Sequence, residues 1–353
     1  MRKKAALISL RFNPAFVQHL VAFAKSFHEL GFGIGFLLDP AYKQFPELAE
    51  LGPETTDSAV SAENSYTHAI FLNVSVQNRD LAARLKRAGT KILVVYHEPW
   101  RALLGYLRTD GLQSVLKGAA AHRVALPLLR LADVVITGSQ FALGVYTQGD
   151  GRYNRNAHCF PLIYDDEGGQ ITPEAAGQKL YFSYIGNIGR VHGFDQFVRV
   201  MRESFARKSD VRFMIASRFP LPEYVLKDKI ISRNLDRIEL MCGRTLQNKE
   251  IDSCYARSFA VWNLYRRSTQ SGVLPKAFMF GTPVVASRIG SFPEYVRDGF
   301  NGRFANADDR EGVLCAVEEL RRRTGEYASN CRRSFLEMFY YRSRLEELRQ
   351  LLA

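Results

Sequence analysis

The sequence is poor in cysteine and in long apolar runs, and each shortage excludes a class of protein. Its five cysteines in 353 residues are scattered, so they form neither a disulfide framework nor a close metal-binding or redox pair. The longest nearly uncharged stretches, Ile34–Pro40 and Lys91–Tyr96, are far shorter than the roughly 20 apolar residues that cross a bilayer. The run Ala5–Leu10 is too short for a signal peptide and precedes no small-residue cleavage site. We therefore expect reduced thiols and a cytosolic protein.

Negative charge is also in deficit. Lysine and arginine total 48 against 36 acidic residues, and the net charge of +12 favours polyanionic partners such as nucleic acid, anionic lipid or phosphorylated ligands. Hydrophobic residues make up 46% and charged residues 24%, which is typical of a folded globular chain. The sequence contains neither zinc-finger spacing nor an RNP aromatic motif. Nucleic acid is therefore not an expected partner.

Short β-rich runs alternate with helical stretches in both halves of the chain, and this alternation predicts an α/β fold with parallel sheets. The helical segment Phe16–Leu30 has apolar residues at a spacing of three to four, which buries one face. Two Rossmann-like domains follow from the two rounds of alternation, with ligands expected at the carboxyl ends of the strands. The predicted strands are Ala5–Leu10, Gly33–Leu38, His68–Val74, Ile92–Tyr96, Val134–Thr137, Leu180–Ile185, Val211–Ala216, Ile238–Met241, Phe259–Leu264 and Pro283–Ala286.

Turn-forming residues at Asp165–Gln178 interrupt the pattern and predict a hinge. We expect an N-terminal Rossmann-like domain at 1–165, a linker at 166–178 and a C-terminal Rossmann-like domain at 179–325. The segment Glu326–Leu351 is helical in pattern, so 326–353 is predicted as a C-terminal helix that packs back on the first domain.

The strongest motif runs from Tyr265 to Ser287: a strand end, a polar loop, a short helix, a glycine stop and a second buried strand. Ser271 is expected to cap that helix, and Gly272 to let a ligand approach the free backbone N–H groups. A diphosphate would fit such an anion site. The alternative is an ordinary capped helix between two strands.

The stretch from Tyr265 to Pro275 resembles one branch of the family 4 glycosyltransferases of the GT-B fold, which carries Tyr-Arg-x-x-Thr-Gln-Ser-Gly-Val-x-Pro. Gly290–Gly302 is similar to the donor-binding region of the same family. The resemblance implies two facing Rossmann-like domains, a nucleotide-diphosphate sugar donor held mainly by the C-terminal one, and transfer with retention of configuration. It implies no metal ion and no further cofactor. The donor contacts it implies here are Thr269, Gln270, Ser271, Gly272 and Val273.

The sequence departs from the family where most members have Glu-x7-Glu. Ser268 and Lys276 stand at the two glutamate positions, so both carboxylates are missing. Contacts to the donor ribose are therefore in question. Lys276 is expected either to add positive charge near the phosphates or to be solvated.

A second motif follows the strand that ends at Ile185. Its glycines, Gly186, Gly189 and Gly193, are spaced GxxGxxxG rather than GxGxxG, and the next strand ends without a ribose-binding acid, so NAD is disfavoured. The turn is similar to the family's Gly-Arg-x-x-x-x-Lys-Gly, whose two cations hold the donor diphosphate. Asn187 and His192 occupy those positions here. We predict that Arg190, as a displaced cation, binds the diphosphate, and a surface arginine is the alternative.

Two further strand ends carry candidate residues. His97 and Glu98 follow a buried strand, and the resemblance implies that His97 contacts the transferred sugar, while Glu98 orients His97 or holds an acceptor hydroxyl. A structural histidine is the alternative. Gly243 and Arg244 lie in a loop that resembles the nucleobase-contacting loop of the family.

Basic residues interleaved with leucines in the first half suggest a surface that rests on anionic lipid, although a solvated amphipathic helix explains them equally well. Such a surface would suit a lipid-linked acceptor and a peripheral position on the inner face of the cytoplasmic membrane. The basic residues are Arg84, Lys86, Arg87, Lys91, Arg101, Arg108, Lys117, Arg123 and Arg130.

The sequence therefore predicts a metal-independent, retaining glycosyltransferase of the hexosyltransferase type, which moves a sugar from a nucleotide-diphosphate donor to a glycan or lipid-linked acceptor in polysaccharide or glycolipid synthesis. Because three donor-site positions depart from the family pattern, a non-catalytic nucleotide-sugar-binding protein or partner subunit is the alternative. A sugar-nucleotide epimerase is a weaker one, since no carboxylate and histidine set suits that chemistry.

Overall fold

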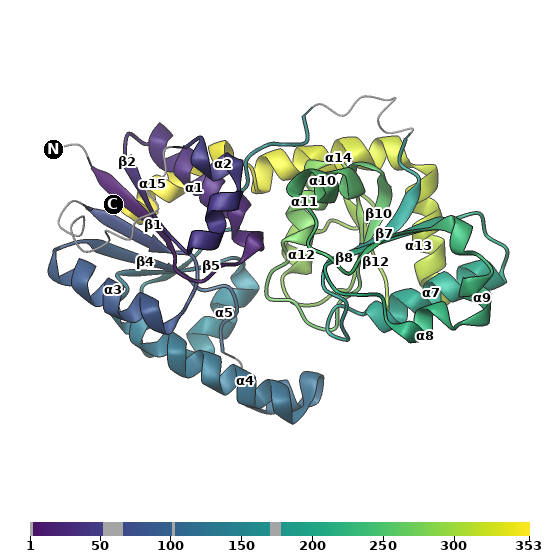
Figure 1. The fold of residues 1–353 in the computed structure, drawn as a ribbon, viewed down its shortest axis with the longest axis horizontal. Coiled ribbons are helices and arrows are strands. Elements are labelled where there is room, and N and C mark those ends of the chain that lie inside the picture. The colour runs from purple at the N-terminus through teal and green to yellow at the C-terminus, as the bar shows by residue number, and fades with distance from the viewer. Residues whose placement is uncertain (1–2, 52–65, 101–102, 170–177) are drawn as a thin grey trace. The chain divides into compact units, whose positions relative to one another are not determined.

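The computed structural model describes residues 3–51, 66–100, 103–169 and 178–353, without the side chains of 103–110 and 114. The chain forms two compact units, one of Met1–Asp165 with Met338–Ala353 and one of Asp166–Glu337. Each unit consists of one parallel sheet with helices on both faces (Figure 1). Most of the predicted hinge, together with Arg101 and the side chain of Arg108, lies outside the described residues.

The first unit contains a six-stranded sheet of order β2-β1-β3-β4-β5-β6. Its strands are rich in Val, Ile, Leu and Ala because helices cover both faces. The register pairs, for example, Leu7 with Phe36 and with Ile70. The strands are β1 (Lys4–Ser9), β2 (Gly33–Leu38), β3 (His68–Phe71), β4 (Lys91–Val95), β5 (Val134–Thr137) and β6 (Ala157–Cys159).

Alternate residues of these strands build two separate cores. Ala5 and Leu7 of β1 face a cluster with α1 (Val17–Glu29), α2 (Pro46–Ala49) and the C-terminal α15 (Leu345–Leu352). Ala6 and Ile8 face a second cluster on the opposite side. That side is covered by α3 (Val76–Arg87), α4 (Leu103–Leu131), which is interrupted at Gly111, and α5 (Gln140–Gly149). Short 3-10 helices lie at Pro14–Phe16 and Pro40–Gln44.

The second unit repeats the design with a sheet of order β12-β11-β10-β7-β8-β9. A buried aromatic cluster of Phe182, Phe197, Phe213 and Trp262 lies between the sheet and α7 (Phe194–Ala206). The strands are β7 (Tyr181–Ile185), β8 (Arg212–Ser217), β9 (Ile238–Cys242), β10 (Ser258–Asn263), β11 (Val284–Ala286) and β12 (Gly302–Phe304).

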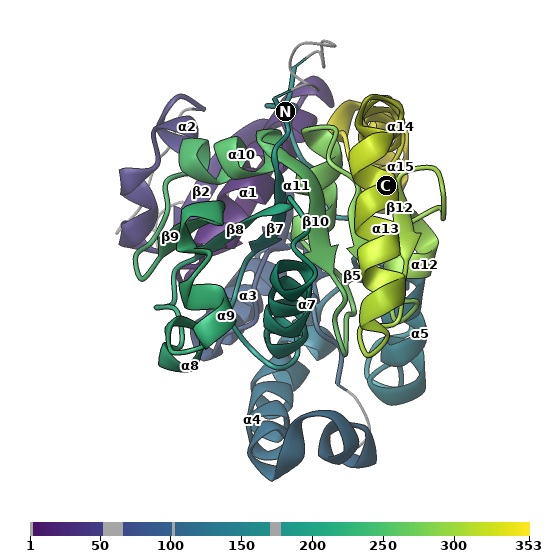
Figure 2. The same ribbon diagram turned by 90° about the vertical axis from the view of Figure 1, so that its right-hand side faces the viewer.

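The helices of the second unit cover both faces of its sheet. Those beside α7 are α8 (Glu223–Leu226), α9 (Lys229–Ser232) and α13 (Arg310–Arg322), and Figure 2 shows α7 and α13 side by side. On the other face lie α10 (Asn248–Ala256) and α11 (Val273–Met279) (Figure 1). The remaining elements are a 3-10 turn at Leu235–Arg237, α12 (Phe292–Tyr295), α14 (Thr324–Met338) and a 3-10 turn at Tyr341–Arg344.

The predicted fold class is confirmed, and each of the ten predicted strands has its counterpart within a few residues. The prediction of one continuous helix over Glu326–Leu351 is wrong. The helix ends at Met338 because the chain there becomes extended and pairs with Tyr164, whose N–H donates to Phe339 O at 2.9 Å while Tyr341 N–H donates back to Tyr164 O at 3.0 Å. The predicted C-terminal segment therefore divides between the two units.

Candidate functional site

The turn between β7 and α7 follows the carboxyl end of a central strand of the second sheet. Two of its glycines are required by the backbone, since Gly186 has φ of 131° and Gly193 has φ of 69°. A Cβ on Gly193 would also lie 2.4 Å from Leu264 O. The GxxGxxxG spacing thus belongs to a tight strand-to-helix turn, and Gly193 begins α7 in the left-handed conformation.

Buried side chains hold this turn from inside. The Tyr184 hydroxyl donates to Asn187 O at 2.6 Å, and Trp262 Nε1–H donates to His192 O at 3.0 Å. The His192 ring packs edge-on against Tyr265 at 4.8 Å between centroids. His192 therefore has a structural place beside the buried Tyr265. These contacts fix the backbone that carries the predicted diphosphate-binding residues.

Arg190 and Asn187 point out of the turn, and both are exposed. Within the described residues, no carboxylate or carbonyl accepts a hydrogen bond from the Arg190 side chain. The neighbouring guanidinium of Arg266 already has partners within the protein: it donates two hydrogen bonds to Asp195 at 2.7 and 2.8 Å and one to Arg190 O at 2.5 Å. The Arg266 guanidinium lowers the pKa of Asp195. Arg190 is thus the cation of this turn that is available to an anionic ligand.

The Thr269–Val273 loop lies beside the turn, since a Cβ on Gly186 would stand 3.8 Å from Val273 Cγ2. The expected capping by Ser271 is wrong: Gly272 is the N-cap of α11, and no side chain caps the helix. Burial raises the pKa of Tyr265, at the start of the same motif, well above its usual value, to about 12. Thr269 is buried, Gln270 and Val273 are half-buried, and Gly272 is exposed.

Ser268 and Lys276, which replace the two family glutamates, have structural partners. The Ser268 hydroxyl donates to Gln270 O at 3.2 Å. Lys276 is 8% exposed and pairs with Asp252 at 2.8 Å and with Glu167. Both expectations for Lys276 are therefore wrong, because its ammonium group is neither solvated nor available to phosphates. Burial raises the pKa of Asp252 to about 6 despite this pairing.

The Cys242–Thr245 loop follows the edge strand β9. Gly243 has φ of 85°, and its N–H lies 3.2 Å from Ser217 O and 3.1 Å from Phe219 O. Arg244 is held by Glu250, with one bond of 2.9 Å, and its guanidinium lowers the pKa of that carboxylate to about 2. Arg244 is therefore an exposed but paired cation beside the predicted nucleobase loop.

His97 and Glu98 lie in the first unit, just after β4. The imidazole stacks on Phe16 at 4.8 Å, and its Nε2–H donates to Leu72 O at 2.8 Å. In the neutral imidazole this bond places the proton on Nε2. Glu98 is exposed and forms no bond to His97, so the expectation that Glu98 orients His97 is wrong.

The sequence did not predict the roles of three residues that hold the site: Tyr184, Asp195 and Arg266. Asp195 stands in the first turn of α7, where a carboxylate suits the helix dipole, and Arg266 directly follows the motif tyrosine. A charge pair between these two positions was the available signal. Tyr184 was predicted only as part of a strand.

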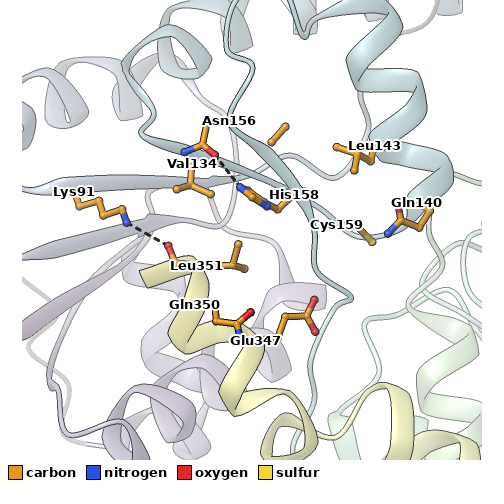
Figure 3. Close-up of a pocket in the computed structure, with 11 residues that line it drawn as sticks. Lys91, Val134, Gln140, Leu143, Asn156, His158, Cys159, Glu347, Gln350 and Leu351 are labelled. Carbon is orange, nitrogen blue, oxygen red and sulfur yellow. Dashed lines mark hydrogen bonds between the residues drawn. The ribbon is translucent and has the colours of Figure 1, made fainter. Parts of the chain in front are cut away.

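A separate pocket of about 480 Å³ follows the edge strand β6 in the first unit (Figure 3). Lys91 and Val134 line it from the amino ends of β4 and β5, and Glu347 and Gln350 line it from α15. His158 Nε2 and Asn156 Oδ1 lie 2.8 Å apart at its rim. Of the described residues that line this pocket, none is a predicted site residue, so it is not the candidate site.

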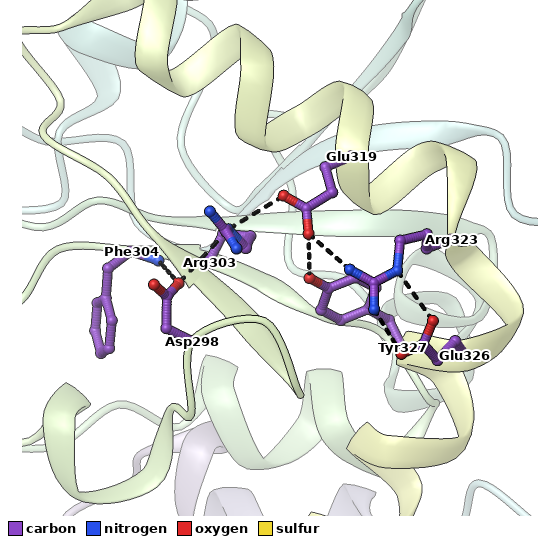
Figure 4. A network of polar contacts seen from close by, with 7 residues as sticks. All are labelled: Asp298, Arg303, Phe304, Glu319, Arg323, Glu326 and Tyr327. Carbon is purple, nitrogen blue, oxygen red and sulfur yellow. Dashed lines mark hydrogen bonds and ion pairs between the residues drawn. The ribbon is translucent and has the colours of Figure 1, made fainter.

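Polar contacts also join β12, α13 and α14 of the second unit. Glu319 accepts hydrogen bonds from Tyr327 at 2.8 Å and from Arg323 at 3.0 Å, and it pairs with Arg303 at 3.4 Å (Figure 4). Asp298 accepts from Phe304 N–H at 2.9 Å. These contacts fasten the last two helices to the edge of the sheet.

No three His, Cys, Asp or Glu side chains converge into a metal-binding group within the described part of the chain. Over the same residues, no helix combines the length and the apolar character that crossing a membrane demands.

Comparison with known proteins gives a family match over part of the chain and a fold. Residues 179–323 match the family Glycosyl transferases group 1. A 41.2 kDa protein in the cps region of Klebsiella pneumoniae is 21% identical over 165 residues, which span 44% of this chain and 43% of that relative. The chain thus aligns with less than half of its curated relative.

Solved structures resemble the whole chain. HepE from Anabaena in complex with UDP has a TM-score of 0.71 at 16% identity, covering 100% of this chain and 99% of its own. Its complex with UDP-glucose has a TM-score of 0.69 at 16% identity with the same coverage. Sucrose-phosphate synthase from Thermosynechococcus elongatus has a TM-score of 0.69 at 14% identity, covering 99% and 98%. The predicted GT-B fold is confirmed, whereas the family 4 branch stays a prediction.

Proposed function

We propose that this protein is a retaining glycosyltransferase that takes its sugar from a nucleotide-diphosphate donor bound by the second unit. The family match over 179–323 and the structural similarity to HepE, which was solved with UDP and with UDP-glucose, support this proposal. A hexose is the proposed sugar. An acceptor hydroxyl attacks the anomeric carbon from the face that the diphosphate leaves, and the departing phosphate takes the hydroxyl proton.

The exposed guanidinium of Arg190 is the observation that carries the proposal. It extends from a rigid turn at the carboxyl edge of the sheet, and Arg266 beside it is neutralised by Asp195. A cation in this place stabilises the negative charge that develops on the leaving diphosphate. We propose that the chain needs no metal ion for this step. Asn187, His192 and Thr269–Val273 stay predicted donor contacts, and His97 is proposed to contact the transferred sugar.

The proposed acceptor is a glycan or a lipid-linked glycan in polysaccharide or glycolipid synthesis. The relative in a cps region supports this pathway. The stretch of α4 from Gly111 to Leu131 contains no carboxylate, and it exposes Leu112 by 65% and Leu116 by 63%. Lys117, Arg123 and Arg130 are exposed on the same stretch. We propose that this surface rests on anionic lipid, which co-sedimentation with phosphatidylglycerol vesicles tests against neutral vesicles.

Calorimetric titration with UDP, GDP and ADP tests the donor site. Arg190→Ala should weaken binding of the preferred nucleotide about 10- to 100-fold, since a hydrogen bond to a charged group contributes about 1.5–3 kcal/mol. Arg233→Ala is the control, because it removes another exposed arginine of the same unit. Equal affinities of the two variants would remove Arg190 from the site.

A non-catalytic nucleotide-sugar-binding protein is the second candidate. The observation in its favour is that Lys276, at a family glutamate position, is locked between Glu167 and Asp252. Incubation with UDP-, GDP- and ADP-sugars separates the two functions. A binder raises its melting temperature without releasing nucleotide, whereas a transferase releases nucleotide when an acceptor is present.

A further inference from the structure

The loop that carries His97 and Glu98 is held at both ends by one carboxylate of another element. Tyr96, which precedes the pair, hydrogen-bonds through its hydroxyl to Asp150. Trp100, which follows it, donates its backbone N–H to Asp150 Oδ2 at 3.2 Å. Asp150 comes from the end of α5, far along the chain. It therefore spans the foot of the loop on which the proposed sugar contact stands.

Asp150 is fully buried, with an exposed fraction of 0%. Burial of a carboxylate is unfavourable unless hydrogen bonds and an opposite charge compensate it. Here burial raises the pKa of Asp150, while the bonds from Tyr96 and Trp100 and the nearby His122 and Arg152 oppose that rise. Such a costly group is expected where it fixes a geometry.

His122 of α4 completes the arrangement. Its Nδ1 lies 3.2 Å from Asp150 Oδ1, and its ring stacks on Trp100 at 5.2 Å between centroids. The imidazole therefore lies against both the carboxylate and the indole that closes the loop. On its far side it meets Tyr153 at 6.4 Å.

The backbone leaves little freedom around this cluster. Asp150 N–H donates to Tyr146 O at 2.7 Å, so the carboxylate is anchored to the last turn of α5. Trp100 O lies so close to Gly149 that a Cβ there would stand 3.1 Å away. Tyr146 lies fully buried beneath, and its ring meets Tyr96 edge-on.

We propose that Asp150 and His122 are positioning residues for His97 and Glu98, and that they hold the loop after β4 in the geometry that sugar transfer requires. This inference rests on the proposed function, since it takes His97 as the sugar contact. Neither residue needs to touch a substrate. The cluster joins β4, α4 and α5, so it sets the direction in which the His97 side chain leaves the sheet.

Asp150→Asn tests the proposal because it keeps the size of the side chain and removes its charge. We expect kcat for sugar transfer to fall about 10- to 100-fold while KM for the donor stays within about twofold. The reason is that a displaced His97 loop disturbs the reaction geometry more than donor binding. His122→Gln, at a partly exposed position, is the second variant and should move kcat in the same direction. It keeps the question answerable if Asp150→Asn fails to fold.

Asp133→Asn is the matched control. Asp133 holds the opposite end of the same strand, where its Oδ2 accepts from Ile92 N–H at 2.8 Å, and it also pairs with Lys86. Its substitution should lower stability and leave kcat unchanged. Equal losses of kcat in Asp150→Asn and Asp133→Asn would overturn the positioning role.

A readout independent of activity is the NMR signal of the His97 Nε2–H group that donates to Leu72 O, assigned by its absence in His97→Gln. Asp150→Asn should shift or broaden this signal, and Asp133→Asn should not. An unmoved signal in Asp150→Asn and His122→Gln overturns the inference. Failure of the wild type to release nucleotide would instead contradict the proposed function.

Discussion

Replacement of Tyr184 by phenylalanine tests whether the turn after β7 is held for nucleotide binding. Tyr184 is 2% exposed, and its hydroxyl donates to Asn187 O at 2.6 Å and also hydrogen-bonds the backbone of Gly189. Phenylalanine keeps the ring against Phe194, at 4.9 Å between centroids. The change therefore removes the polar anchor of the turn and little else.

The lost hydrogen bond should lower the free energy of unfolding by about 1 kcal/mol, and by up to about 3 kcal/mol if the Asn187 carbonyl finds no other donor. The same loss frees the turn that carries Arg190. Because about 1.4 kcal/mol corresponds to a tenfold change in an equilibrium constant, we expect the Kd for UDP to rise about 5- to 10-fold. Urea denaturation and titration calorimetry measure the two effects separately.

Tyr327→Phe is the control in the same unit. Tyr327 is fully buried, and its hydroxyl donates to Glu319 at 2.8 Å in the network of Figure 4, on α14. This variant should lose a similar free energy of unfolding and keep the UDP affinity of the wild type. If both variants bind UDP with the same affinity, the Tyr184 hydroxyl does not shape the donor site.

Two further predictions concern the first unit. Burial lowers the pKa of His68 below 6.5, so the unfolded chain binds more protons than the folded chain just below that pH. The stability that neutral His68 contributes is therefore present above pH 6.5 and is lost as the pH falls. Between about pH 7.5 and about pH 5.5, the free energy of unfolding measured in urea should fall more for the wild type than for His68→Gln, which can still donate to Leu352 O. Equal losses would show that His68 does not cause this pH dependence. Leu348 is 1% exposed, so Leu348→Ala should lower the free energy of unfolding of the first unit by about 2–5 kcal/mol and leave UDP affinity unchanged in calorimetry. A loss below about 1 kcal/mol would show that α15 is not part of that core.

The fold was largely predictable because its central strands are continuous apolar runs buried on both faces. β6 and β12 were missed because each has three residues and includes half-exposed or exposed positions, such as Ala157 and His158 of β6. A three-residue strand that is partly exposed is defined by its partner rather than by a pattern of its own, whereas the equally short β11 is fully buried and was predicted. The break at Phe339 was missed for a similar reason, since it is made by pairing with the distant Tyr164.

The site was predictable in its backbone and much less in its side chains. Glycine spacing and strand ends located the turn at Gly186–Gly193 and the loop at Thr269–Val273. Which charges pair within the protein depends on tertiary neighbours, and this decided the places of Lys276 and Arg244. The fully buried Asp150 carried no local signal, because its partners come from two other segments.

The return of the chain to the first unit has a consequence for biosynthesis. All of Asp166–Glu337 leaves the ribosome before Met338 does, so the second unit is the first to have every one of its elements available. The first unit begins earlier but waits for α15, whose Leu348 and Leu352 cover its core. Throughout translation of the intervening residues, the nascent N-terminal sheet keeps an uncovered apolar face, which is the kind of surface that chaperones bind.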